Sequence, residues 1–69
     1  MELSARNIFK GKVTSIKKGA VAAEVQVDIG GGNTITSTIT VDSVERLGLT
    51  DGTEVSAIIK SSEVILGVG

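Results

Sequence analysis

The 69-residue chain contains no cysteine, histidine, proline, tryptophan or tyrosine, and these absences exclude several classes of function. Without cysteine there can be no disulfide and no thiolate metal ligand. Without histidine, a zinc or copper site is not expected. No serine lies in the G-x-S-x-G motif of hydrolases. We therefore predict that the chain is not an enzyme and that it holds no bare metal cation.

Large aromatic side chains are also nearly absent, and Phe9 is the single one. Below about 70–80 residues, one hydrophobic core rarely supplies more than ~3–5 kcal/mol of stability. Valine, isoleucine and alanine bury less apolar area per residue than phenylalanine or tryptophan. We therefore expect residues 1–69 to form a single domain that associates with copies of itself and buries apolar area between them.

The chain has no excess of either charge, because seven basic and eight acidic residues leave a formal net charge of −1. This balance provides no general attraction to nucleic acid or to an anionic membrane. No apolar run approaches the ~20 residues of a membrane-spanning helix. Glu2, Arg6 and Lys10 interrupt any apolar stretch that could resemble a signal peptide. We expect neither a nucleic acid nor a membrane as partner, and the cytoplasm as the default location.

Residues that favour strands are abundant, with nine valines, eight isoleucines and seven threonines. Alternation of apolar and polar residues is clearest over residues 21–29 and again over 34–41. Gly11 interrupts the first strand, where we expect a bend or a change of partner. Gly30-Gly31-Gly32 lacks the Lys-Ser/Thr of a phosphate-binding loop and predicts a hairpin tip. The predicted strands cover residues 8–16, 21–29, 34–41, 53–60 and 63–66.

One short helix is expected after the third strand. Asp42 with Glu45 three residues later fits a capping box, and Gly48 fits the C-terminal cap. The predicted order is three strands, a short helix and two further strands. This order indicates an all-β fold, a five-stranded antiparallel OB-like barrel with one short helix after the third strand.

Hydroxyl groups gather at the expected strand ends. Ser4-Ala5-Arg6 precedes the first strand, Thr40 ends the third, and Lys60-Ser61 follows the fourth. Hydroxyl and backbone donors, with one or two cations, are the groups that bind an inorganic oxyanion. Taken singly, each cluster also fits an ordinary role, because serine commonly forms turns and exposed cations are usually solvated.

These same residues carry a resemblance to a known family. Ser4-Ala5-Arg6-Asn7, followed by Lys10-Gly11-Lys12-Val13, resembles the opening of the molbindins, which are small bacterial molybdate-binding proteins. The similarity extends over the whole chain and includes further matching segments: Lys18-Gly19, Ala23-Glu24-Val25, Ile39-Thr40, Asp42-Ser43-Val44, Leu47-Gly48-Leu49 and Ile59-Lys60-Ser61.

The resemblance implies intracellular storage or buffering of molybdate, and comparably of tungstate. It implies a homohexamer, built as a trimer of dimers, that holds the anion at subunit interfaces. It also assigns a main oxyanion site to six positions: Ser4, Ala5, Arg6, Thr40, Lys60 and Ser61. A second kind of site in the family relies more on backbone groups, and we place it around Lys18, Gly19 and Ala20.

Two other functions remain open from the residues alone. A nucleic-acid-binding OB module would stack bases on aromatic side chains over a basic groove, and Phe9 with a net charge of −1 disfavours it. A purely structural oligomerisation module would assemble without regard to molybdate. Binding to single-stranded nucleic acid at low salt, or indifference to molybdate in a thermal melt, would identify these alternatives.

Overall fold

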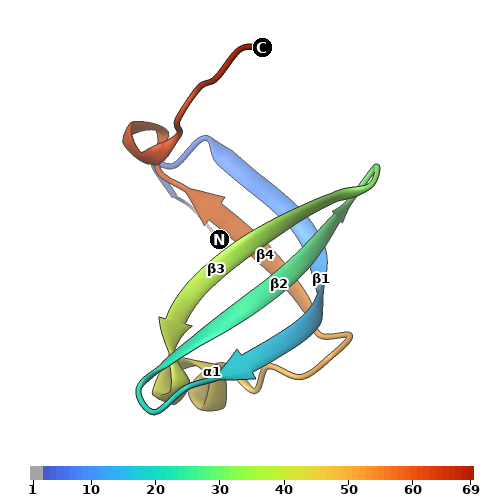
Figure 1. The fold of residues 1–69 in the computed structure, drawn as a ribbon, viewed down its shortest axis with the longest axis vertical. Coiled ribbons are helices and arrows are strands. Elements are labelled where there is room, and N and C mark those ends of the chain that lie inside the picture. The colour runs from blue at the N-terminus through green and yellow to red at the C-terminus, as the bar shows by residue number, and fades with distance from the viewer. Residues whose placement is uncertain (1–2) are drawn as a thin grey trace.

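The computed structural model describes residues 3–69, which form one curled antiparallel sheet with a short helix at its end (Figure 1). The strands lie in the order β3-β2-β1-β4, so β3 and β4 are the two edges. The helix follows β3, as the sequence predicted. The elements in chain order are β1 Asn7–Lys18, β2 Ala22–Gly30, β3 Asn33–Thr40, α1 Val41–Leu47, β4 Glu54–Ile59 and the 3₁₀ turn η1 Ser61–Glu63.

Strand β1 changes partner at Gly11 and Lys12, which confirms the predicted break. Its first half pairs with β4 from Asn7 to Lys12, and its second half pairs with β2 from Lys12 to Lys18. A Cβ on Gly11 would overlap the carbonyl oxygen of Asp28 and lie 2.9 Å from Cγ1 of Val27. Glycine is therefore required at the point where β1 leaves β4 and begins to pair with β2, because the Asp28 backbone lies against it. The sheet curls at this change of partner.

The core consists of small aliphatic side chains. Val13, Ala23, Val25, Val27 and Val44 are buried, and they come from β1, β2 and the face of α1 that meets the sheet. The alternation predicted over residues 21–29 is confirmed, because Ala23, Val25 and Val27 of β2 share the buried face. In β3, Thr34, Thr36, Thr38 and Thr40 are exposed, in agreement with the alternation predicted over residues 34–41. The single aromatic residue lies outside this core. Phe9 is 40% exposed, so the shortage of core that composition indicated is present in the fold.

The N-cap of helix α1 lies two residues earlier than predicted, and the proposed capping box at Asp42 is wrong. Thr40 is the N-cap, in an extended conformation, and its Oγ1 accepts a hydrogen bond from the Ser43 N–H at 3.0 Å. This geometry satisfies one of the backbone donors left free at the start of a helix. Asp42 instead lies in the first turn and pairs with Arg46 at 3.2 Å. Gly48 ends the helix in the left-handed conformation, as predicted.

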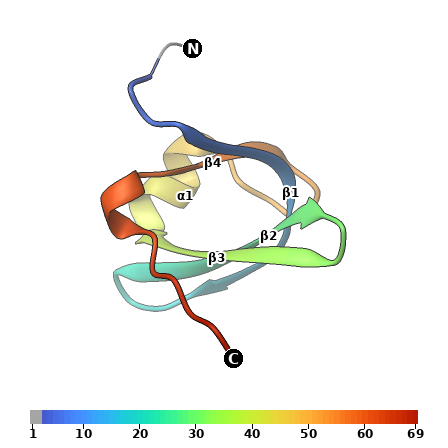
Figure 2. The ribbon, with the colours of Figure 1, turned by 90° about the horizontal axis from the view of Figure 1, so that it is seen from above.

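The predicted fifth strand is wrong for this chain's own sheet. Residues 61–63 turn into η1, and residues 64–69 pair with no strand of the sheet. Turning the chain at η1 carries the last residues away from the sheet (Figure 1). The barrel is therefore open between β3 and β4. Seen from above, the four strands curl around a common centre, and α1 lies at the end of this curled sheet (Figure 2).

Candidate functional site

Arg6 and Lys60 directly adjoin the last residue pair of β1 and β4, at one end of the sheet. Asn7 pairs with Ile59 in the antiparallel register of β1 and β4. Continued by one residue, this register places Arg6 opposite Lys60. Ala5 and Ser61 are the next residues on each side, and Ser61 already begins the 3₁₀ turn η1. The Asn7 side chain fixes the junction, because its Nδ2 donates to the carbonyl oxygen of Ile59 at 3.2 Å.

The two cations at this end form no ion pair within the described chain. Arg6 and Lys60 are both exposed, and neither has a carboxylate partner among residues 3–69. Ser4 and Ser61 are exposed beside them, so hydroxyl donors flank the two cations. Adjacent like charges repel each other, and an anion between them would offset that repulsion. We call residues 4–6 and 60–61 the Arg6–Lys60 end.

Thr40 lies at the opposite end of the sheet. It pairs with Ala22 at the start of β2, next to the turn that follows Lys18. A strand of the length of β1 spans roughly 35 Å along its contour, close to the 34 Å longest dimension of the molecule. Five of the six predicted ligands of the main oxyanion site therefore lie at one end of the sheet, and Thr40 lies at the other. Figure 1 shows α1, which follows Thr40, at the end of the molecule opposite the C-terminal turn.

The Thr40 hydroxyl is held by a small polar network that sequence reasoning missed. Its Oγ1 donates to Ser43 Oγ at 2.8 Å, and Nη2 of Arg46 donates to the same Ser43 oxygen at 3.4 Å. A hydroxyl has one hydrogen, so Thr40 must turn away from Ser43 in order to donate to an anion. The spacing of Thr40, Ser43 and Arg46, three residues apart, was the sequence signal that these side chains share one side of the helix.

The residues proposed for the second site lie at this same end. Lys18 ends β1, and Gly19 and Ala20 form the turn into β2, closed by a 2.8 Å bond from Gly19 N–H to the Ala22 oxygen. A shallow hollow of about 470 Å³ adjoins the turn, lined by Ala20, Val21, Thr40, Val41, Asp42 and Glu45. The carboxylates of Asp42 and Glu45 would repel an anion. Within one chain, this hollow therefore lacks the positive charge that an oxyanion site requires.

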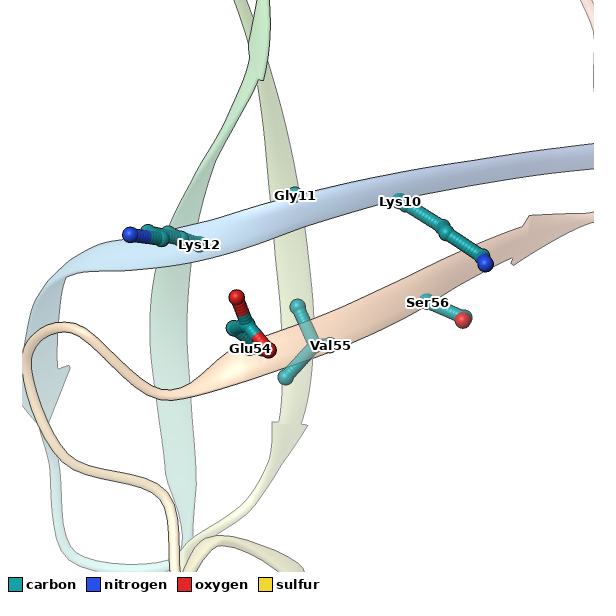
Figure 3. Close-up of a pocket in the computed structure, with 6 residues that line it drawn as sticks. All are labelled: Lys10, Gly11, Lys12, Glu54, Val55 and Ser56. Carbon is teal, nitrogen blue, oxygen red and sulfur yellow. The ribbon is translucent and has the colours of Figure 1, made fainter.

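The hollow on the outer face of β1 and β4 contains none of the predicted ligands. It measures about 480 Å³, and its lining residues are Lys10, Gly11, Lys12, Glu54, Val55 and Ser56. Figure 3 shows the Lys10 and Lys12 side chains pointing away from each other, with Glu54 beside Lys12. These charges do not converge on one point. The hollow is therefore a feature of the strand surface where Gly11 has no side chain.

Comparison with known proteins agrees with the resemblance found in the sequence. Residues 3–66 match the TOBE domain family. Molybdenum-pterin-binding protein 1 of Clostridium pasteurianum is 54% identical over 66 residues, which is 96% of this chain and 97% of that protein.

Two solved structures share the fold. MopII from Clostridium pasteurianum, in an apo form, aligns with a TM-score of 0.91 and 52% identity over 97% of this chain and 100% of its own. The cytoplasmic molybdate-binding protein ModG, with molybdate bound, aligns with a TM-score of 0.95 and 52% identity over 100% of this chain and 49% of its own. The similarity to small molybdenum-binding proteins predicted from Ser4-Ala5-Arg6-Asn7 and the matching segments after it is thereby confirmed. This chain belongs to the TOBE domain family and, within it, to the group of molybdenum-pterin-binding proteins.

Proposed function

We propose that the chain binds molybdate reversibly, with tungstate as a comparable ligand, and stores or buffers it in the cytoplasm. The observation that carries the proposal is the Arg6–Lys60 end, where two exposed cations and two exposed serines adjoin the paired ends of β1 and β4, and neither cation forms an ion pair among residues 3–69. Relatives of nearly the same length are named for binding a molybdenum compound, and ModG is described with molybdate bound. Residues 1–69 serve as one molybdate-binding domain.

The proposed site is shared between copies. Thr40 cannot meet Arg6 within one chain, because the two lie at opposite ends of the sheet. All six predicted ligands converge only if the Arg6–Lys60 end of one copy meets the Thr40 end of another. Such a head-to-tail contact closes into a ring when its rotation permits. A ring of this kind is compatible with the proposed homohexamer, a trimer of dimers, whose symmetry comes from the family resemblance.

The chemistry of the proposed ligands suits molybdate among the inorganic oxyanions. Molybdate carries no proton at pH 7, so a site of donors alone satisfies it. Phosphate is partly protonated at this pH and requires an acceptor for that proton. None of the side chains of the Arg6–Lys60 end is a carboxylate. Sulfate also accepts only, but it is smaller, so donors spaced for molybdate would make longer and weaker hydrogen bonds to it.

The role proposed here is binding without covalent chemistry. The metal arrives surrounded by its own oxygen atoms, so the protein supplies hydrogen bonds and positive charge rather than metal ligands. Among residues 3–69, no three carboxylates gather into a cluster that could hold a bare cation. Within that same range, no helix has the length and apolar character needed to cross a membrane.

Thr40→Asp tests the contribution of the Thr40 end to binding. Aspartate is a good N-cap, so α1 should keep its cap and the apo melting temperature should stay within a few degrees of wild type. The new carboxylate would face the anion, and molybdate affinity should fall at least tenfold. Thr40→Ser keeps both the cap and the hydroxyl, and should bind nearly as wild type does. Isothermal calorimetry measures both affinities, and equal affinity in Thr40→Asp would remove Thr40 from the site.

A thermal melt with added molybdate tests the proposed function most directly. A ligand at a hundred times its dissociation constant stabilises the folded state by about 2.7 kcal/mol. For a chain of this size, that corresponds to a rise in melting temperature of roughly 10–20 °C. Tungstate should act similarly, and sulfate at the same concentration should have little effect. The absence of any shift with molybdate would leave the purely structural oligomerisation module as the function.

A further inference from the structure

Two contacts hold the Arg46 side chain against the first turn of α1. Its Nε donates to Asp42 Oδ2 at 3.2 Å, and its Nη2 donates to Ser43 Oγ at 3.4 Å. Asp42 and Ser43 precede Arg46 by four and three residues, so the three side chains share one side of the helix. Both donors belong to one planar guanidinium, whose rigid shape fixes their relative positions. The contact with Asp42 therefore keeps Nη2 directed at the Ser43 hydroxyl.

The Ser43 hydroxyl lies between Arg46 and Thr40. Its oxygen accepts from Thr40 Oγ1 at 2.8 Å and from Nη2 of Arg46. A hydroxyl oxygen has two acceptor positions, so these two bonds use both of them. The Ser43 backbone N–H donates separately to Thr40 Oγ1 at 3.0 Å. This backbone bond keeps the Thr40 and Ser43 side chains together in whichever direction the Thr40 hydrogen points.

The hydrogen of the Thr40 hydroxyl is the group that the proposed site requires. In order to donate to an anion, Thr40 must give up its bond to Ser43 Oγ. An oxygen that loses its donor costs free energy when water is excluded, as it would be once a second copy covers the Thr40 end. Arg46 is the second donor to this oxygen, and its bond does not use the Thr40 hydrogen. With Arg46 in place, Thr40 can therefore turn to the anion while Ser43 Oγ keeps a donor.

We propose that Arg46 is a positioning residue of the molybdate site, which holds the Ser43 hydroxyl and so frees the Thr40 hydroxyl to donate to the anion. Arg46 acts through Ser43 and makes no contact with the anion itself. The Asp42 carboxylate, 3.2 Å away, offsets its positive charge, so direct attraction of an anion by Arg46 is small. The proposal rests on the proposed function, because it requires that Thr40 belongs to the molybdate site.

Arg46→Ala and Arg46→Lys on the full chain separate position from charge. Arg46→Ala should lower molybdate affinity about three- to tenfold, the factor expected for one hydrogen bond of ordinary strength. Arg46→Lys keeps the charge but replaces the planar fork with a single ammonium group, so it should restore little of the lost affinity. Calorimetry at fixed ionic strength measures both. The far-UV circular dichroism and the apo melting temperature should change little, since the lost ion pair is exposed.

A double variant tests whether Arg46 acts through Ser43. Ser43→Ala keeps the backbone N–H that bonds to Thr40 Oγ1, so α1 keeps its N-cap. In this background Arg46→Ala should change molybdate affinity by less than twofold, because the hydroxyl that Arg46 holds is already absent. An effect of charge alone would persist in the Ser43→Ala background. Ser56→Ala removes an exposed serine from β4 and is the matched control, in which Arg46→Ala should have its full effect.

Three outcomes would overturn the role of Arg46 while leaving molybdate binding intact. The first is wild-type affinity in Arg46→Ala. The second is full recovery of affinity in Arg46→Lys, which would assign the effect to charge. The third is an equal loss from Arg46→Ala in the wild-type and Ser43→Ala backgrounds. Wild-type protein is titrated in the same buffer, and its failure to bind molybdate would instead contradict the proposed function and, with it, this role of Arg46.

Discussion

Arg6→Ala is expected to weaken molybdate binding by about ten- to a hundredfold, and Lys60→Ala by a similar factor. Each cation would make charge-assisted hydrogen bonds to the anion, worth roughly 1.5–3 kcal/mol, and about 1.4 kcal/mol corresponds to a tenfold change in affinity. The double variant should lose more than either single variant. Both side chains are exposed and belong to no packed cluster, so the far-UV spectrum and the apo melting temperature should change little.

Matched substitutions distinguish the site from general charge. Lys12→Ala removes an exposed lysine from β1 that lies opposite Glu54, away from both Arg6 and Thr40. Lys17→Ala removes an exposed lysine from β1. Both should bind molybdate within about twofold of wild type, since exposed pairs contribute little. Calorimetry at fixed ionic strength makes the comparison. If Arg6→Ala and Lys60→Ala bind as tightly as these controls, the Arg6–Lys60 end is not the site.

Gly11→Ala should be the most damaging single substitution for stability. Its new Cβ would overlap the Asp28 carbonyl oxygen and lie 3.1 Å from the Asp28 carbonyl carbon, and a backbone group cannot move aside as a flexible side chain can. Overpacking of this kind costs about 1–3 kcal/mol. A loss of about 2 kcal/mol would lower the melting temperature of so small a chain by roughly 8–16 °C.

Gly67→Ala provides the control for the glycine substitution. Gly67 has open space around its Cβ position and needs no left-handed backbone, so the melting temperature should stay within about 2 °C of wild type. Both variants are melted at the same chain concentration, because association makes the melting temperature depend on concentration. A stable Gly11→Ala variant would show that β1 and β2 can separate at the crossing without loss of the fold.

Short-range patterns carried most of the prediction of the fold. Alternation in residues 21–29 and 34–41 predicted β2 and β3 to within about a residue, and Gly48 marked the end of α1. The N-cap was misplaced because Asp42 and Thr40 both suit that position by type. Thr40 took it because its backbone is extended and its hydroxyl reaches the Ser43 N–H. The strand predicted over 63–66 failed because strand pairing depends on where η1 directs the chain.

The candidate site, like the fold, could be predicted only in part from local sequence patterns. Its residue types were predictable, because serine, arginine and lysine beside strand ends are the donors that an oxyanion needs. Their placement was not, since residues 4–6 and 60–61 are more than fifty positions apart in sequence. The register of β1 with β4 brings them together. The register of β2 with β3 places Thr40 at the far end.

The absence of cysteine and histidine, by itself, left no basis for expecting a zinc or copper site, and the near absence of aromatic residues predicted a small aliphatic core. Those conclusions depend only on which side chains are present. The tertiary structure alone decided that the barrel stays open between β3 and β4. It also decided that the exposed apolar residues 64–68 project from the sheet, and that the proposed ligands lie at opposite ends of the sheet. These properties depend on long-range strand pairing and on the direction of one 3₁₀ turn, which local sequence patterns do not specify.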